Sequence, residues 1–462
     1  MEYNPVPTWT ASTLQKRISG QVIEPGDPSY DQARSAWNLS VDQKPALIVI
    51  PENVADLIVA VEHATDAGIG VAVQATGHGV SQPADGRMLI LTRAMKEVRI
   101  NPVDRTAWIE AGARWGEVLE KSQRFGLAPL LGSSPDVGAI GYTLGGGMGW
   151  LARKFGLAVD SVRRFELVAA TGDFIQASPS ENPDLFWGLR GGGGGLGIVT
   201  RMEVDLYPVS RVYGGNLFYP ASIAGQVYRR YREWIETVPD ELTSSIVLMN
   251  YPPTPELPEP LRGQSFIIVR GCFCGPILND GVKLLQYWRD WQAPLMDEFK
   301  PMPFSDVAAI SNDPPDPVPG RSTSAWLSGF HDEAIEALID YGFPGPGGPP
   351  LAVTEVRHAG GAIARVDPET TAYSLRQARH LLQLIGITPT PDLSDQLVQY
   401  TTALLEALEP HLDRGVYMNF LEGEESRRRV REGFSTEAYN RLAELKARYD
   451  PDRRLHAGFA IH

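Results

Sequence analysis

The stretch Val71-Ala-Val-Gln-Ala-Thr-Gly-His-Gly-Val80 predicts a short strand that ends in a loop of small residues around one histidine. Residues 47–50 form a similar aliphatic run, and residues 53–67 repeat apolar side chains at helical spacing before Gly68. The chain from 47 to 80 therefore predicts strand, helix and strand. In such α/β units the loop after a strand places backbone amides against a ligand. A lone histidine is more often a hydrogen-bonded structural residue than a reactive one, so the rest of the sequence must decide the role of His78.

The composition is that of a soluble globular enzyme. The chain has 462 residues, enough for two or three domains, and is 43% hydrophobic and 21% charged. Its formal net charge of -14 disfavours nucleic acids and anionic membranes as partners. The first residues lack the basic and apolar regions of a signal peptide, and no apolar run is long enough to cross a membrane. We therefore expect a cytoplasmic protein.

The two cysteines, Cys272 and Cys274, lie two residues apart. On a strand both thiols point to the same face, but this spacing would strain a disulfide. No second pair of Cys or His side chains lies at a spacing that suits zinc. We expect two small buried side chains and no metal site.

Two further segments are rich in glycine. Residues 132–149 hold seven glycines, and residues 191–195 are five glycines in a row. The flanks of the second run, Leu-Phe-Trp before it and Gly-Ile-Val-Thr after it, are typical of a protein core. We therefore predict a bend between buried elements there, and not a flexible linker. Glycine at this density lets the backbone adopt unusual conformations or approach a ligand closely.

Three glycine-rich loops together predict one extended ligand held by backbone amides. A pyrophosphate suits such a site, because amides carry a smaller desolvation cost than buried lysines. None of the loops contains the Gly-Lys-[Ser/Thr] of a P-loop, and none is a convincing dinucleotide fingerprint between a strand and a helix. The residues alone therefore predict a large phosphate-bearing cofactor and disfavour a generic nicotinamide site.

The character of the chain changes after residue 208. We predict strands near residues 212–218, 244–249, 265–273, 352–357 and 361–366, and helices near residues 223–237, 279–291, 332–341 and 393–408. Proline-rich turns interrupt these elements, including residues 343–350. The pattern predicts a separate antiparallel α+β domain. The tail contains one more predicted helix, at residues 436–449.

Several motifs in a fixed order resemble a known family. They are the Gly-His loop at 77–79, Pro135-x-Val-Gly-x-x-Gly-x-x-x-Gly-Gly-Gly-x-Gly149, Asp184-Leu-Phe-Trp-x-x-Arg-Gly-Gly-Gly-Gly, and the terminal Tyr-x-Asn-Phe and Tyr449-Asp-Pro. Together they are similar to the FAD-linked oxidases of the vanillyl-alcohol oxidase or PCMH type, in the berberine-bridge-enzyme-like branch. The resemblance covers residues 40–208 and 415 to the end. It implies an α+β fold in which residues 1–208 and the tail 413–462 form a two-lobed FAD-binding domain, with an antiparallel-sheet substrate domain inserted at 209–412.

The resemblance also implies how the cofactor is held. In this family the His of the Gly-His loop is attached to the flavin 8α-methyl group, and His78 occupies that position. Many relatives carry a second link from a Cys where this chain has Ser134, so a single link is implied. Val137 stands where relatives with Val tend to admit oxygen, which favours an oxidase. The implied FAD-binding residues are Thr76, Gly77, His78, Gly79, Val80, Val137, Gly138, Gly141, Leu144, Gly145, Gly149, Gly197, Ile198, Val199 and Asn419.

Three side chains are candidates for the chemistry on the substrate. Glu355 lies in the predicted strand Val353-Thr-Glu-Val-Arg-His358, on the same face as Arg357, and relatives place acids on this sheet. We expect Glu355 to be a base whose pKa is raised by burial, with a solvated Glu355–Arg357 pair as the alternative. Tyr417 is a second candidate base or orienting phenol, or else a buried core aromatic. Tyr251 is a third candidate, with an ordinary loop aromatic as the alternative, and His331 and His358 are weaker.

The sequence thus predicts an FAD-dependent oxidase, mono-covalent through His78, that passes electrons from a small alcohol, amine or polyketide-like molecule to O2. One alternative is an oxygenating tailoring enzyme of secondary metabolism, since His78 and Glu355 resemble the branch that includes the favorskiase of enterocin biosynthesis. The others are a dehydrogenase with non-covalent FAD and a flavin-binding module without activity. The expected partners are the substrate and O2, and the protein is expected to be a monomer or homodimer.

Overall fold

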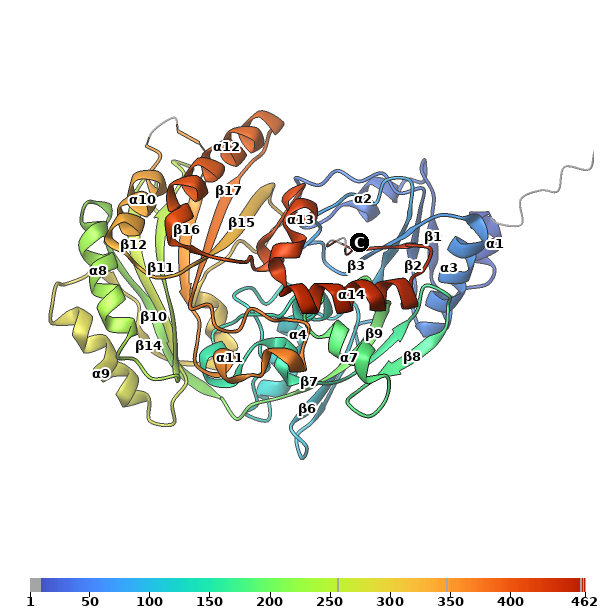
Figure 1. Ribbon diagram of the computed structural model, residues 1–462, viewed down its shortest axis with the longest axis horizontal. Helices are drawn as coiled ribbons and strands as arrows, with labels where there is room; N and C mark the ends of the chain where they lie inside the picture. The colour runs from blue at the N-terminus through green and yellow to red at the C-terminus, as the bar shows by residue number, and fades with distance from the viewer. Residues whose placement is uncertain are drawn as a thin grey trace, which may run out of the picture.

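The computed structural model describes residues 10–255, 257–345, 348–349, 351–457, 459 and 461. Three sheets organise this part of the chain, with helices around them (Figure 1). The first nine residues, where the sequence predicts no signal segment, lie outside the described residues, as does part of the proline-rich segment 343–350. No helix in the described ranges has the length and apolar character needed to cross a membrane.

The first sheet carries the His78 loop. Its strands run in the order β1 (Gln21–Ile23), β2 (Leu47–Ile50), β4 (Met88–Leu91), β3 (Val71–Gln74) and β19 (Leu455–His456), and all neighbours but β1 and β2 are parallel. Three helices accompany it, α1 (Ala11–Gln15), α2 (Tyr30–Arg34) and α3 (Val54–Ala67). Asn53 caps the start of α3, and Gly68 ends it with a positive φ of 67°. The predicted strand, helix and strand are confirmed.

The second sheet is antiparallel, in the order β5 (Val98–Asn101), β6 (Thr106–Glu110), β9 (Ile198–Asp205), β7 (Val162–Val168) and β8 (Phe174–Ala177). Its core also takes side chains from helices that lie before, within and after the glycine-rich segments and from a helix of the tail. These helices are α4 (Trp115–Gln123), α5 (Ala139–Leu144), α6 (Ala152–Phe155), α7 (Pro183–Leu189) and α14 (Thr436–Tyr449). The bend predicted at the glycine run therefore joins α7 to β9, and both are buried.

The third sheet contains nine antiparallel strands. Their order is β13 (Met296–Asp297), β10 (Arg211–Pro220), β12 (Ser265–Phe273), β11 (Leu242–Asn250), β16 (Leu351–His358), β17 (His380–Ile387), β15 (Gly320–Leu327) and β18 (Leu412–Asp413), with β14 (Lys300–Pro303) beside β10. Helices cover one face: α8 (Ala224–Ile235), α9 (Leu278–Arg289), α10 (Asp332–Gly342) and α12 (Pro391–Leu408) (Figure 1). The other face is turned toward the rest of the molecule. The predicted α+β fold class is confirmed.

One predicted element is wrong. Residues 361–366 form the short helix α11 (Ala362–Arg365) and not a strand. Gly360 and Gly361 have φ values of +82° and +57°, and a Cβ at Gly361 would lie 2.3 Å from the carbonyl oxygen of Arg153. The chain turns there against α6, which prevents a strand from continuing.

The remaining elements are α13 (Glu425–Arg428) and short 3-10 turns at Thr92–Ala94, Ala158–Ser161, Ala221–Ile223, Phe304–Ile310, Pro368–Thr370, Glu409–His411, Met418–Phe420 and Val430–Gly433.

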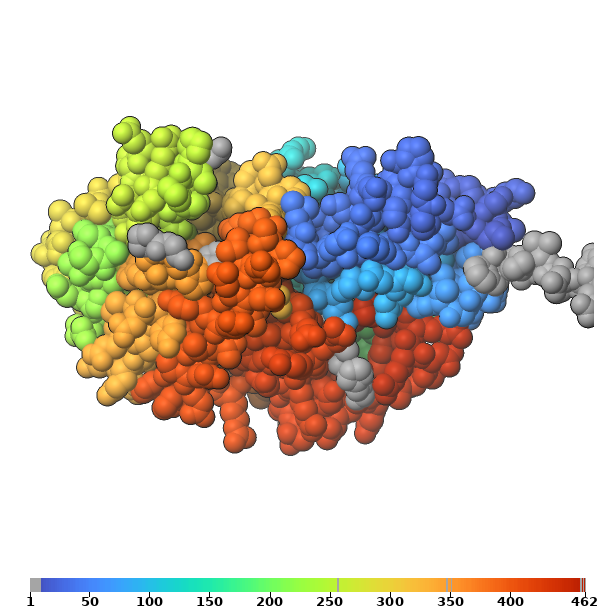
Figure 2. Space-filling model, turned by 90° about the horizontal axis from the view of Figure 1, so that it is seen from above, coloured from blue at the N-terminus to red at the C-terminus, as the bar shows by residue number. Residues whose placement is uncertain are grey.

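The C-terminal tail returns to the first sheet. Strand β19 pairs with β3, with Leu455 opposite Val71, and the red C-terminal segment lies against the blue N-terminal one in Figure 2. The turn between α14 and β19 is organised by Asp450, which is fully buried and accepts hydrogen bonds from the backbone N–H groups of Arg454 and Leu455 at 2.8 and 2.9 Å. Its carboxylate also pairs with Lys446 Nζ at 2.6 Å.

Replacing this carboxylate should destabilise the protein strongly. In Asp450→Ala two backbone donors lose their acceptor and Lys446, only 12% exposed, loses its counter-ion. We expect the free energy of unfolding in urea to fall by about 3–5 kcal/mol, the usual result of breaking a buried ion pair. The control is Asp452→Ala, a 66% exposed carboxylate two residues away, for which we expect about 0.5 kcal/mol or less. Equal effects of the two variants would contradict the role given to Asp450.

Candidate functional site

A cavity of about 1080 Å³ lies between the helix-free face of the third sheet and the loops of the other two. The predicted FAD-binding residues line it, apart from Gly145 and Gly149. Those two glycines stand behind the wall, where backbone segments pack closely: a Cβ at Gly149 would lie 1.7 Å from the carbonyl oxygen of Leu131, and one at Gly145 would lie 1.9 Å from Asn419 Oδ1. Their spacing in the motif therefore reflects close packing of the loop and not contact with the cavity.

His78 is held in one orientation by its neighbours. Its Nδ1 lies 2.9 Å from Thr76 Oγ1, and its ring stacks on Trp37 with centroids 4.2 Å apart. The loop is fixed to this tryptophan through the backbone, because Trp37 N–H donates to the Thr76 carbonyl and Asn38 N–H donates to that of Gly77. The other ring nitrogen, Nε2, is buried and has no hydrogen-bond partner among the described residues. One polar atom of His78 is therefore unsatisfied.

The environment keeps this imidazole neutral. Burial lowers the pKa of His78 to about 4, with a smaller opposing effect from Asp136 and a small further lowering from Arg114. At neutral pH the ring therefore carries a free lone pair, which is the form that can act as a nucleophile. Burial thus favours a reactive state of His78.

The other residues implied at the cofactor also have definite places. Ser134 and Val137 line the cavity, and Ser134 carries no sulfur for a second link. Cys272 and Cys274 are free, buried thiols that do not line it. Burial raises the pKa of Cys274 to about 12 and that of Cys272 well above its ordinary value, so neither is a thiolate at neutral pH. Both are the small buried side chains that the sequence predicts.

Charged side chains from neighbouring strands gather on the sheet side of the cavity. Ser245 of β11 is the register partner of both Arg270 on β12 and Arg357 on β16. Its small side chain leaves room for the two guanidinium groups to approach Glu355, which is 3% exposed. Arg357 Nη2 lies 2.9 Å from Glu355 Oε2, and Arg270 Nη1 lies 3.8 Å from Oε1. Gln383 of β17 accepts a further hydrogen bond from Arg357 at 3.1 Å.

The expected rise in the pKa of Glu355 is wrong. Burial acts to raise it, but the guanidinium groups of Arg357 and Arg270 outweigh burial and lower the pKa of this carboxyl below its ordinary value. The expected alternative, a solvated Glu355–Arg357 pair, is also wrong, because the pair exists but is buried at the cavity wall. Glu355 is therefore an ionised carboxylate that can accept a hydrogen bond or a proton.

Tyr417 does not line the cavity. It is 1% exposed, and its hydroxyl oxygen accepts hydrogen bonds from the N–H groups of Gly147 and Met148 at 3.1 and 2.9 Å and from Asn419 Nδ2 at 3.2 Å. Burial raises the pKa of this phenol. These contacts support the core-aromatic alternative, in which Tyr417 positions the glycine loop from behind.

Tyr251 does line the cavity, and its ring contacts Phe266 edge-on. The two weaker candidates do not line it. His358 lies on the opposite face of β16 with its Nε2 2.9 Å from Arg153 Nη1, and His331 precedes α10.

The sequence analysis missed one carboxyl of the cavity, Glu422. It accepts a hydrogen bond from the Ser322 N–H at 3.0 Å. Burial raises the pKa of Glu422 to about 8, although the Ser322 amide and Arg321 act against this. The signal in the sequence that could have predicted Glu422 as a cavity residue is its position two residues after the Tyr-x-Asn-Phe motif. It is a protonatable group on the tail side of the cavity.

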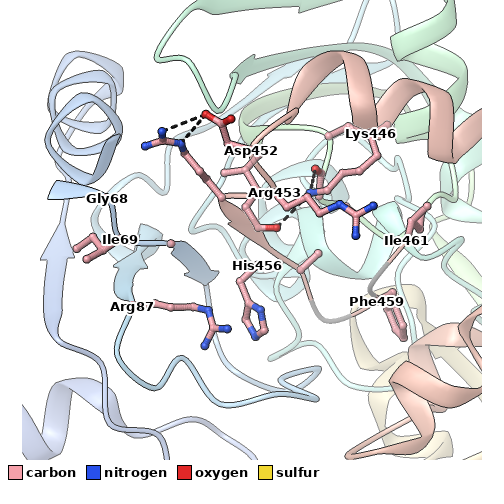
Figure 3. A pocket seen from close by; sticks show the side chains of 16 residues that line it. Gly68, Ile69, Arg87, Lys446, Asp452, Arg453, His456, Phe459 and Ile461 are labelled. Carbon is pink, nitrogen blue, oxygen red and sulfur yellow. Dashed lines mark hydrogen bonds and ion pairs between the residues drawn. The ribbon is translucent and has the colours of Figure 1, made fainter. Parts of the chain in front are cut away.

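A smaller cavity of about 490 Å³ adjoins one end of the large one and shares the glycine run and the last residues of the tail with it. Figure 3 shows Arg87 and His456 projecting into it from the first sheet, with Arg453 and Lys446 on the side of α14. Arg87 and Arg453 form no ion pair with any residue that the structure describes. This end therefore complements a negatively charged ligand group. No cluster of three or more His, Cys, Asp or Glu side chains suited to a metal ion occurs in the described part of the chain.

Tyr417→Phe separates the structural role of the phenol from a catalytic one. Removing the hydroxyl leaves the buried N–H groups of Gly147 and Met148 without their acceptor, so we expect the free energy of unfolding to fall by about 1–3 kcal/mol. In the control Tyr251→Phe, whose hydroxyl bonds to no described residue, we expect about 0.5 kcal/mol or less. Unchanged stability of Tyr417→Phe, together with lost turnover, would instead place the hydroxyl in the chemistry.

Comparison with known proteins identifies the family. The families described as FAD binding domain and as Berberine and berberine like match residues 45–178 and 416–457. The uncharacterized FAD-linked oxidoreductase YgaK of Bacillus subtilis (strain 168) is 30% identical, with 94% of this chain and 95% of the relative covered. (R)-6-hydroxynicotine oxidase of Paenarthrobacter nicotinovorans is 28% identical, with 96% and 97% covered. The crystal structure of 6-hydroxy-D-nicotine oxidase from Arthrobacter nicotinovorans matches with a TM-score of 0.84 at 25% identity, covering 96% of this chain and 98% of that one. The chain therefore belongs to the FAD-linked oxidoreductases of the vanillyl-alcohol oxidase and PCMH type, within the berberine-bridge-enzyme-like oxidases.

Proposed function

We propose that this protein is an oxidase that holds FAD through one covalent bond to His78 and passes electrons from a small organic substrate to O2. The observation that carries the proposal is the half-buried, neutral imidazole of His78, which lines the cavity and whose buried Nε2 has no partner among the described residues. A covalent bond to the cofactor would fix its position there. Oxidase relatives such as (R)-6-hydroxynicotine oxidase support O2 as the acceptor.

The cavity fits a cofactor of this size. Its volume of about 1080 Å³ slightly exceeds the range of about 300–1,000 Å³ that small-molecule sites usually offer, so it has room for a dinucleotide and a substrate. Gly79 and Gly141 line it, and no atom lies within 4 Å of where a Cβ would stand on either residue. A ligand can therefore approach the backbone at these positions. When bound, FAD would supply the acceptor for two electrons.

The residues of the third sheet would then act on the substrate. The carboxylate of Glu355, kept ionised by its two arginines, can accept the proton of a substrate O–H or N–H group. Its lowered pKa makes it a weak base, so it would orient the substrate by accepting a hydrogen bond before it takes the proton. Val137 lines the cavity beside Gly138. A valine at this position is the residue that the resemblance associates with access of oxygen to the flavin, which supports an oxidase.

The division into 1–208, 209–412 and 413–462 is part of this proposal. It is supported by the grouping of all strands between 211 and 413 in the third sheet and by the pairing of β19 with β3. The cytoplasmic location rests on the composition, and the alternative of non-covalent FAD is an outcome that the following test distinguishes.

Acid precipitation of the purified protein tests the covalent bond. We expect the pellet to stay yellow, because a covalent flavin survives unfolding, and to be colourless for His78→Ala. The matched control is His63→Ala, a buried histidine of α3 outside the cavity, which should keep the colour. A colourless wild-type pellet with free FAD in the supernatant would contradict the proposed attachment. Release of hydrogen peroxide during turnover of a substrate supports an oxidase, and its absence indicates a dehydrogenase.

The pH dependence of attachment tests the neutral imidazole. Attachment needs the unprotonated ring, and with a pKa of about 4 His78 stays unprotonated as the pH falls from about 7 to about 5. We expect the rate of FAD attachment to purified apoprotein, read as bound flavin after acid quenching, to change less than about twofold over this range. An ordinary imidazole with a pKa of about 6.5 would lose about 20-fold or more. A fall of that size would show that burial does not keep the His78 ring unprotonated.

A further inference from the structure

The sheet side of the cavity holds one buried and one half-buried cation against one buried anion. Arg270 is 6% exposed and Arg357 has an 18% exposed side chain, and both approach the single carboxylate of Glu355. The neighbouring polar side chains, Asn216 and Gln383, are uncharged. The wall therefore has an excess of one positive charge, and burying an uncompensated guanidinium is costly.

Neither guanidinium has its hydrogen-bonding capacity filled. Arg270 Nε is buried without a partner, and its Nη2 reaches only the Ser311 carbonyl at 3.4 Å. Arg357 uses Nε and Nη2 for Glu355 and Gln383, and its Nη1 bonds to no residue that the structure describes. The two arginines thus have unused N–H donors and carry one positive charge more than Glu355 balances. Together they form a binding site for a planar oxyanion such as a carboxylate.

The other charged groups around the cavity do not supply a buried anion. Glu298, which accepts a hydrogen bond from Asn216, and Asp313, which acts on Arg357, are both exposed at the rim, where solvent screens them. Glu422 has a pKa of about 8 and is mostly uncharged at neutral pH, and His78 and His456, with pKa values of about 4, are neutral. Arg321 adds a further cation. Rim carboxylates therefore compensate the two arginines only from solvent, and an anionic ligand in the cavity can supply a direct counter-charge.

An apolar strip lies beside the charged group on the sheet side of the cavity. Moving along the sheet from Glu355 and its neighbours, the cavity is lined by Phe218, Met249, Val353, Ile385 and Ile387, with Leu257 and Leu261 added by the loop between β11 and β12. Ile387 is 38% exposed, so this apolar strip extends to the surface. A ligand that follows it would have an apolar body and would place one end at the arginines.

We propose that the substrate of this enzyme is a carboxylate with an apolar body, whose carboxylate is bound by Arg270 and Arg357 while the body lies along the apolar strip. The inference rests on the proposed function, since it concerns the molecule that the flavin oxidises. Substrate binding then neutralises the excess charge of the wall. Arg270 and Arg357 are the residues that determine specificity for the acid over its neutral analogues.

Calorimetric titration of the holoenzyme with matched acids and amides tests this proposal. The probes are cinnamate with cinnamamide and octanoate with octanamide, which differ in charge but little in shape. We expect at least one acid to bind at least about tenfold more tightly than its amide, the loss expected for one charge-assisted hydrogen bond. Arg270→Gln and Arg357→Gln should abolish this preference, whereas Arg357→Lys, which keeps the charge, should retain part of it.

Two further variants sharpen the test. Glu355→Gln removes the anion of the wall, so it should tighten binding of the acid while turnover falls. Arg379→Gln, an exposed arginine paired with Glu236, is the control and should leave the preference unchanged. The proposal is overturned if neither acid binds, if amides bind as tightly as acids, or if the two Gln variants alter the flavin spectrum while the preference survives, since the arginines would then serve the cofactor.

The colour of the acid-precipitated pellet separates this proposal from the proposed function. A variant that keeps its covalent flavin but loses the acid preference supports the carboxylate site. Wild-type protein with covalent flavin and no preference for acids refutes the carboxylate site alone. A colourless wild-type pellet refutes the covalent attachment, whatever the titrations give.

Discussion

The contact between residues 76–79 and residues 36–38 is the constraint on which the site depends. At Gly77 φ is +85°, and a Cβ there would lie 2.7 Å from Trp37 N, so a larger residue would separate the two segments. Because they touch, Trp37 stacks on His78 and buries it. Burial then lowers the pKa of the imidazole and leaves it neutral. A backbone contact that only glycine allows thus determines the protonation state of the histidine.

The two sides of the cavity are built on different principles. The side toward the first and second sheets consists largely of backbone, where glycines leave space beside the chain, as at Gly79 and Gly141. The side toward the third sheet consists of side chains whose positions follow from strand register, with Ser245 between Arg270 and Arg357. The first arrangement suits a cofactor that every member of the family binds. The second can change with single substitutions, which suits substrate selection.

Sequence patterns predicted local structure and chemistry within one segment. They gave the helix at 436–449, the His78 loop and the common face of Glu355 and Arg357, because periodicity and glycine spacing act locally. They did not give the direction of the Glu355 pKa shift, because it depends on how closely Arg357 approaches the buried carboxylate and on a smaller contribution from Arg270, which is distant in sequence and lies across β11. The hydrogen bonds of the Tyr417 hydroxyl join the tail to Gly147, about 270 residues earlier, and were equally invisible.

Peptide mapping by mass spectrometry tests the central claim, a single covalent bond between a neutral His78 and the flavin, most directly. The purified protein would be digested with trypsin, and the flavin-bearing peptide would be identified by its absorbance and fragmented. The account predicts one flavin-bearing peptide, which contains residues 71–80, with the added mass on His78. Flavin found only free, or attached to any other residue, would contradict it.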